Sequence, residues 1–281
     1  MGNHHHGHDH QHDHSTDGLP DLLDLDAEVL HAYQAEFITE VAETAGEEPR
    51  RILDLGSGTG AGTLALAARF PAAELIAVDV SPDMLERLRA KAGHAGVGGR
   101  VQTVPADLDE GWPNVDDVDL VWASASMHHV ADPVRVLRNA LGAIRPGGLI
   151  ALVEAAGMPR FLPDSVGNGV EGRLHAALAA NHAEEMPHRG ADWGPLLEKA
   201  GFAVVAAPHY RINLVAPLPP ATPRYAHAVL NRMRTGLHNR LSAEDRATLH
   251  TLLDGHGPET VLERDDLTVV GDRTAWIGRR Q

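Results

Sequence analysis

The chain has 281 residues, enough for one large domain with a buried core, and its 43% apolar and 22% charged residues are ordinary for a globular protein. It has no cysteine, which excludes disulfides, thiolate metal sites and a cysteine nucleophile. The net charge of −15 argues against nucleic acid as a partner, and no apolar run or signal pattern indicates a membrane or export, so we expect a cytoplasmic protein.

Residues 1–18 form a His-rich tail without apolar anchors, which predicts disorder. Histidine and aspartate at this density can bind Ni²⁺, Zn²⁺ or Cu²⁺ through imidazole nitrogens. We interpret this as loose transition-metal binding without a function, with a functional metal site in the tail as the alternative. We expect the folded domain to span residues 19–281.

A helix is predicted next, over residues 24–45. Leu30, Tyr33, Phe37 and Val41 recur at helical spacing and predict one buried face.

The segment after this helix is predicted to be a buried strand over residues 51–55 that runs into a glycine-rich turn. Gly56, Gly58 and Gly60 allow the turn to tighten and let backbone N–H groups approach a ligand. The following helix, over residues 61–70, points its partially positive N-terminus at the same place.

Two further strands end in carboxylates. The strand over residues 74–79 ends at Asp79, which can accept both hydrogen bonds of a ribose diol. Ser81 caps the next predicted helix, over residues 82–92. A third strand, over residues 100–105, precedes Asp107, a possible acceptor for the amine of an adenine.

Two nucleoside cofactors compete for this pattern. Gly56, Gly58 and Ala61 satisfy the loose dinucleotide fingerprint, which predicts an NAD(P)-dependent oxidoreductase. Asp54 is poorly placed against a diphosphate but suits the ammonium group of a methionine moiety. Together with the G-x-G-x-G spacing and Asp107, it favours an adenosyl-methionine cofactor.

The remaining elements continue the alternation of strands and helices, which predicts an α/β fold with a parallel sheet. Strands are expected over residues 118–123, 148–154, 203–215 and 267–278, and helices over 132–144, 170–183 and, as a pair, within 218–256. Side chains that end strands should share one site: Asp54, Asp79, Asp107, Ser124 and Glu154. Residues 155–190 and 218–256 interrupt the alternation as insertions.

The motifs LDLGSGTG, AVDVSPDML, PADL, ASASMHHVADP and RPGG, in this order, resemble the class I S-adenosylmethionine-dependent methyltransferases, closest to their small-molecule branch. The resemblance implies a Rossmann-like, seven-stranded, mostly parallel sheet with helices on both faces and an antiparallel last strand. It further implies a helical lid at residues 155–190 and a late helical insertion at 218–256. The implied reaction is methyl transfer to a small organic acceptor at oxygen or nitrogen.

The resemblance also implies roles for individual residues. Gly56, Gly58 and Gly60 would wrap the methionine part, Met84 would lie against the adenine with Leu108 beside it, and Tyr33 would line the site. The full set of expected cofactor contacts is Tyr33, Asp54, Gly56, Ser57, Gly58, Gly60, Asp79, Val80, Met84, Asp107, Leu108 and Ser124.

The transfer mainly requires an in-line arrangement without water, and a base only when the acceptor must lose a proton. Candidates are His128, His129 and Glu154, each with a packing or hydrogen-bonding role as the alternative. The lid histidines, His175, His182 and His188, are interpreted as solvent-facing or satisfied polar residues, with binding of substrate or a metal as the alternative. A non-catalytic cofactor- or metal-binding protein remains a second alternative.

Overall fold

The computed structural model describes residues 18–281, apart from the side chains of residues 182–185. The predicted disorder and metal binding of the His-rich tail therefore fall outside the described residues, except for Gly18, and stay predictions.

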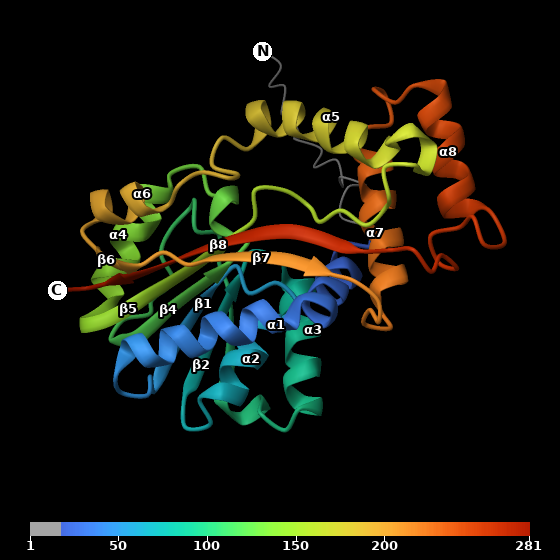
Figure 1. Cartoon of the computed structure of the whole chain (residues 1–281). Coiled ribbons are helices and arrows are strands. Elements are labelled where there is room, and N and C mark those ends of the chain that lie inside the picture. Colours follow the sequence, from blue (N-terminus) through green and yellow to red (C-terminus); the bar gives the residue numbers. More distant parts are fainter. Residues whose placement is uncertain (1–17) are drawn as a thin grey trace, which may run out of the picture.

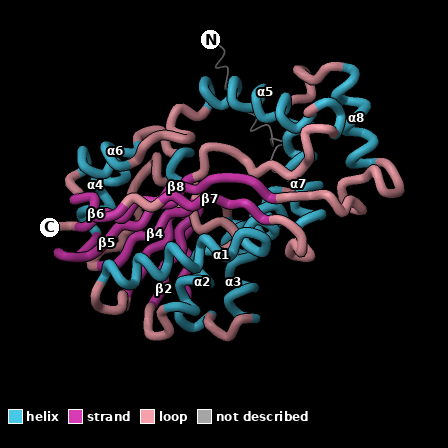
Figure 2. The backbone as a smooth tube through the Cα atoms, viewed as in Figure 1, coloured by secondary structure: helices cyan, strands magenta, loops and turns pink. Residues whose placement is uncertain are grey.

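A central sheet of eight strands organises the described chain (Figures 1 and 2). Its strands are β1 (Arg51–Leu55), β2 (Glu74–Asp79), β3 (Val101–Pro105), β4 (Val118–Ser124), β5 (Ile144–Glu154), β6 (Ala203–Ala206), β7 (His209–Leu214) and β8 (Val269–Arg279). The order is β3-β2-β1-β4-β5-β8-β6, with β7 also beside β8. The first five strands are parallel and β8 runs antiparallel to its neighbours, which confirms the predicted α/β topology.

The strand predicted over residues 203–215 is divided into β6 and β7, so the sheet has one more strand than predicted. Pro208 lies between them and has no N–H to donate to the ladder, although its carbonyl accepts from Ala275 N–H at 2.9 Å. Both short strands pair with the long strand β8, and together they occupy the place of the single predicted strand.

Helices cover both faces of the sheet (Figure 1). The described helices are α1 (Leu19–Ala45), α2 (Ala61–Arg69), α3 (Pro82–His94), α4 (Pro133–Ala143), α5 (Val170–Glu185), α6 (Gly194–Ala200), α7 (Thr222–Gly236) and α8 (Ala243–Asp254), besides short 3-10 turns. Helices α1, α2 and α3 pack on one face and α4 and α6 on the other. Helix α1 begins five residues before its predicted start, because Pro20 suits a first helical turn, and α6 was not predicted.

Helix α1 belongs to two hydrophobic cores. Its second half buries Phe37, Ile38 and Val41 against the sheet and α2. Its first half buries Leu22 and Leu30 in a separate core with α5, α7 and α8, the helices of the two insertions. The insertions are thus attached to the sheet partly through α1.

Two glycines of the loop after β1 are required by packing. Gly56 has a φ of +66°, and a Cβ there would lie 2.4 Å from the Cβ of Ser126. Gly60 has a φ of +89°, and its Cβ would lie 2.5 Å from Leu88 Cγ in α3. The loop therefore fits closely between the segment after β4 and α3, which sets its position at the end of the sheet.

Candidate functional site

Asp79 joins the ends of β1 and β2. Its Oδ2 accepts a hydrogen bond from Gly58 N–H at 2.8 Å, and its Oδ1 accepts one from Ser81 N–H at 2.9 Å. Ser57 N–H donates to the carbonyl of Val78 at 2.9 Å. Each carboxylate oxygen can accept a second bond, so Asp79 orders the glycine loop and still has capacity for ligand hydroxyls.

The glycine loop fits a bound polar ligand. The hydroxyl of Ser57 is buried and has no hydrogen-bond partner among the described residues. A Cβ on Gly58 would lie 3.2 Å from Leu23 of α1. Because glycine has no Cβ, its backbone stays uncovered beneath α1. An orphaned hydroxyl beside a bare backbone is the arrangement expected where a ligand supplies the missing partner.

Residues expected around an adenine lie at the ends of β2 and β3. Val80 is 65% exposed, unusual for an isolated valine, and Met84 is buried in the first turn of α3. Asp107 is exposed and its Oδ1 accepts from Asp109 N–H at 2.8 Å, while the half-buried Leu108 follows it. The structure thus brings these four residues to the same end of the sheet as the glycine loop.

Asp54 is buried, unlike Asp79 and Asp107 at the ends of β2 and β3. Its Oδ2 accepts a hydrogen bond from the Thr63 hydroxyl at 2.6 Å, which ties β1 to α2. Desolvation, above all, raises the pKa of Asp54 to about 7, with Thr63 opposing and the charge of Asp79 adding to the shift. Contact of Asp54 with a methionine ammonium group stays a prediction.

The raised pKa of Asp54 predicts a specific pH dependence of stability in the ligand-free protein. Between pH 4 and pH 7 the unfolded state loses this proton while the folded state keeps it, so rising pH lowers the free energy of unfolding by about 4 kcal/mol. Asp54→Asn lacks this contribution. Denaturant titrations of both proteins should therefore show the stability difference moving in favour of the variant as pH rises. A pH-independent difference would contradict the assignment.

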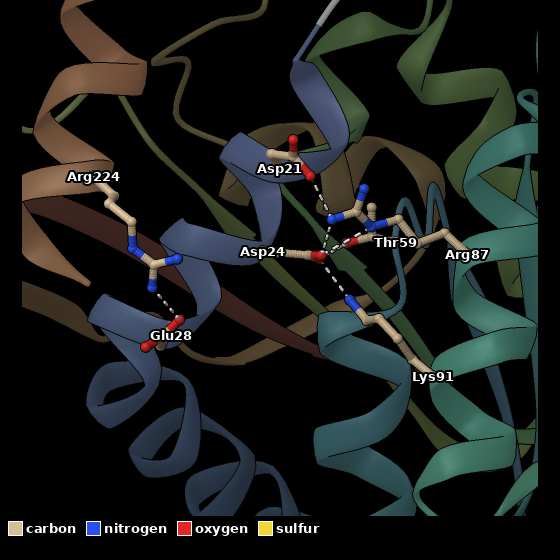
Figure 3. A network of polar contacts seen from close by, with 7 residues as sticks. All are labelled: Asp21, Asp24, Glu28, Thr59, Arg87, Lys91 and Arg224. Carbon is tan, nitrogen blue, oxygen red and sulfur yellow. Dashed lines mark hydrogen bonds and ion pairs between the residues drawn. The ribbon is translucent and has the colours of Figure 1, made fainter. Parts of the chain in front are cut away.

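Helix α1 is attached to the glycine loop and α3 by a polar network. Figure 3 shows its residues: Asp21, Asp24, Glu28, Thr59, Arg87, Lys91 and Arg224. Asp24 accepts from the Thr59 hydroxyl at 2.6 Å, from Lys91 Nζ at 2.5 Å and from Arg87 Nε at 2.9 Å. Burial alone would raise the pKa of Asp24, but these donors outweigh it and lower the pKa. A longer ion pair of 3.8 Å joins Glu28 to Arg224 in α7.

The same helix also reaches the ends of β4 and β8. Asp26 accepts from Arg273 of β8 at 3.2 Å and from the hydroxyl of Tyr225. The Arg273 guanidinium lies 5.6 Å from the centroid of the Tyr33 ring. Burial raises the pKa of Tyr33, and hydrogen bonds of its hydroxyl with Arg273 and Ser124 oppose the shift. Helix α1 therefore contacts both the glycine loop and the end of β4.

The two histidines after β4 have different environments. His128 is 8% exposed, and its Nδ1 lies 2.7 Å from Oε2 of Glu154, which is 4% exposed. Glu154 Oε1 also accepts from Met127 N–H at 3.0 Å, so this carboxylate holds the turn. The ring centroid of His129 lies 4.1 Å from that of His128, and desolvation, then the charges of His128, Arg189 and Arg232, lower the pKa of His129.

Two of the lid histidines can be compared with their interpretation. His175 is half-buried; its ring has a hydrogen bond with the backbone of Pro159, whereas its Nε2 has no partner among the described residues. Burial and the charge of Arg160 lower its pKa to about 4, which keeps the ring neutral at pH 7. His188 is half-buried with its ring 6.4 Å from Trp193, and the side chain of His182 lies outside the described residues.

The family of the domain follows from comparison with known proteins. The family described as "Methyltransferase domain" matches residues 52–148, which span the glycine loop, Asp79, Asp107 and His128. A trans-aconitate 2-methyltransferase from Methylobacterium radiotolerans is 32% identical over 197 residues, which cover 70% of this chain and 64% of that protein. Residues 52–148 therefore form a class I, S-adenosylmethionine-dependent methyltransferase domain. S-adenosylmethionine is accordingly its cofactor.

Two further likenesses agree with this assignment of the methyltransferase domain. A malonyl-[acyl-carrier protein] O-methyltransferase from Laribacter hongkongensis is 29% identical, over 72% of this chain and 65% of that protein. The YcgJ protein of Bacillus subtilis has the same fold, with a TM-score of 0.53, 19% identity and coverage of 89% and 98% of the two chains. The chain thus spans slightly less than two thirds of the length of these two curated relatives.

The part of the chain that the structure describes contains neither a membrane-spanning helix nor a cluster of metal ligands. None of its helices is both long and apolar enough to cross a membrane. Within residues 18–281, apart from the side chains of 182–185, no group of three or more histidine, aspartate or glutamate side chains could hold a metal ion.

Sequence reasoning missed Asp24, Arg189 and Arg273. The sequence pattern marks Asp24 only as the start of a helix. The cluster of Asp21, Asp24 and Asp26 ahead of an apolar stripe is the signal that could indicate a polar network. No local pattern marks Arg189 or Arg273, because their partners come from segments distant in the sequence.

Proposed function

We propose that the chain catalyses transfer of the methyl group of S-adenosylmethionine to an oxygen atom of a small organic acceptor. The observation that carries this proposal is the shared site: the glycine loop, Asp79 and the His128–Glu154 pair lie at adjoining strand ends, and all but Glu154 fall within the matched methyltransferase domain. The name of the Methylobacterium relative supports a small acceptor, and that of the Laribacter relative supports an oxygen.

In this proposal different residues of the chain bind the cofactor and position the end of β4. Asp79 binds the ribose hydroxyls, Val80 and Met84 contact the adenine with Leu108 beside them, Asp107 accepts from its amine, and the loop from Gly56 to Gly60 surrounds the methionine part. The bound cofactor supplies an electrophilic methyl group. Glu154 fixes His128 in a buried hydrogen bond, so the pair orients the end of β4, and catalysis rests mainly on positioning and exclusion of water.

The test is calorimetric titration of the full chain with S-adenosylhomocysteine and, separately, with NADPH. We expect micromolar binding of S-adenosylhomocysteine and no binding of NADPH, since the carboxylates Asp54 and Asp79 disfavour a diphosphate at the loop. Methylated product from trans-aconitate or a malonyl thioester, measured by mass spectrometry, would then support the acceptor class. Binding of NADPH alone would contradict the proposal, and binding of S-adenosylhomocysteine without transfer to any oxygen acceptor would favour a non-catalytic role.

A further inference from the structure

Arg189 lies near the end of β5 and is influenced by the charges of two arginines from distant segments. Arg189 lies between α5 and α6, Arg232 in α7 and Arg273 in β8. Burial lowers the pKa of Arg189 first, and the positive charges of Arg232 and Arg273 lower it further, while Glu154 opposes the shift. Such crowding of guanidinium groups is unfavourable by itself, and it is conspicuous in a chain whose net charge is −15.

Arg189 is held in this position by its own turn. Its N–H donates to the carbonyl of Met186 at 3.0 Å. The next residue, Gly190, has a φ of +72°, and a Cβ there would contact Ala156 at 3.5 Å. Ala156 follows Glu154 by two residues, so the turn brings Arg189 to the end of β5, next to the His128–Glu154 pair.

The three arginines differ in their partners. Arg273 is 6% exposed, binds Asp26 at 3.2 Å and lies over the ring of Tyr33. Arg232 also has an interaction partner. The Nε of Arg189, in contrast, is buried and has no hydrogen-bond partner among the described residues. A buried N–H of a charged group without an acceptor is destabilising, so the Nε–H of Arg189 is available to an acceptor atom of a ligand.

We propose that Arg189 binds a carboxylate of the methyl acceptor and determines specificity, while the charges of Arg232 and Arg273 make its surroundings more positive. This inference rests on the proposed function and extends it to an acidic acceptor. A carboxylate offers two acceptor oxygens in the geometry of the guanidinium fork, satisfies Nε–H and relieves the repulsion among the three positive charges. This carboxylate subsite adjoins His129 and Glu154, where the acceptor must lie to reach the methyl group.

A carboxylate could also come from the methionine part of the cofactor, and a phosphate would satisfy a guanidinium group as well. We assign the subsite to the acceptor because the methionine part is expected at the glycine loop after β1, whereas Arg189 adjoins the end of β5. The test must therefore measure binding of cofactor and acid separately.

The experiment is calorimetry on the full chain saturated with S-adenosylhomocysteine. Succinate and tricarballylate serve as carboxylate probes, succinamide as the uncharged analogue and inorganic phosphate as the competing anion. We expect the wild-type protein to bind at least one of the two acids. Its affinity for succinamide and for phosphate should be clearly lower than its affinity for that acid. Arg189→Gln should weaken binding of that acid at least tenfold and leave the affinity for S-adenosylhomocysteine unchanged within twofold. Arg189→Lys keeps the charge but not the guanidinium fork, so its affinity for the acid should lie between those of the wild-type protein and of Arg189→Gln.

Arg246→Gln is the matched control, because it removes a positive charge from an exposed position in α8 and should change neither affinity. Equal melting temperatures would show that the variants are folded. The inference is overturned if the cofactor-loaded wild-type protein binds neither acid, if phosphate binds as tightly, or if Arg189→Gln weakens cofactor binding instead. Failure of the wild-type protein to bind S-adenosylhomocysteine would overturn the proposed function itself.

Discussion

Replacement of Asp79 with alanine is expected to weaken binding of S-adenosylhomocysteine by about 10²–10⁴-fold. In the proposed complex Asp79 accepts hydrogen bonds from both ribose hydroxyls, and a bond to a charged group contributes about 1.5–3 kcal/mol, so two of them correspond to this loss. The variant also removes the acceptor of Gly58 N–H and Ser81 N–H, which loosens the glycine loop and the start of α3. Calorimetric titration measures the dissociation constant directly.

Two variants separate ligand contact from loop stability in this experiment. Asp83→Ala removes the same charge from an exposed position in the first turn of α3 and should leave the affinity unchanged. Asp79→Asn keeps one acceptor oxygen and should fall between alanine and the wild-type protein. An unchanged affinity in Asp79→Ala, at a melting temperature equal to that of the wild-type protein, would show that Asp79 does not bind the ribose.

Replacement of Glu154 with alanine is expected to lower both stability and turnover. The change leaves Met127 N–H and the His128 ring without their acceptor in a buried environment, at a cost of about 3 kcal/mol in the free energy of unfolding. For a chain of this size that corresponds to a fall in melting temperature of roughly 6–12 °C. Since the turn carrying both histidines would shift, we also expect kcat to fall by about 10–100-fold.

Glu154→Gln discriminates a positioning role from a role as a base. The amide oxygen can still accept from Met127 N–H and its NH₂ can donate to His128, so we expect most of the stability and of kcat to be restored, with an unchanged pH profile. The measurements are the melting temperature and the dependence of kcat and of KM on pH. If the glutamine variant is as stable as the wild-type protein but as inactive as the alanine variant, Glu154 acts as a base and the positioning role is wrong.

The amino-acid sequence determined the elements that depend on local pattern. The strand–glycine loop–helix unit at residues 51–70, the stripe of α1 and the Ser81 cap could be predicted, because periodicity, capping and glycine chemistry act over a few residues. The antiparallel last strand was expected only from the family resemblance. The carboxylates at the ends of parallel strands could also be placed together, since such ends lie at one edge of a sheet.

Other features were decided only by the tertiary structure. Asp54 appears in the sequence to be one more strand-end carboxylate, yet the packing of α2 buries it and raises its pKa. Glu154 and His128 are 26 residues apart and form their bond only because β4 and β5 are neighbours.

The same holds for Asp24 with Lys91 and for Arg189 with Arg232 and Arg273. Asp24 and Lys91 meet because α1 packs beside α3, and Arg189 meets the other two because the turn after α5, α7 and β8 fold toward the same end of the sheet. Electrostatic interactions depend on distance in space and on burial, neither of which a local pattern contains. The sequence therefore determined the cofactor side of the site, which is built from contiguous motifs, whereas folding decided the acceptor side, which is assembled from distant segments.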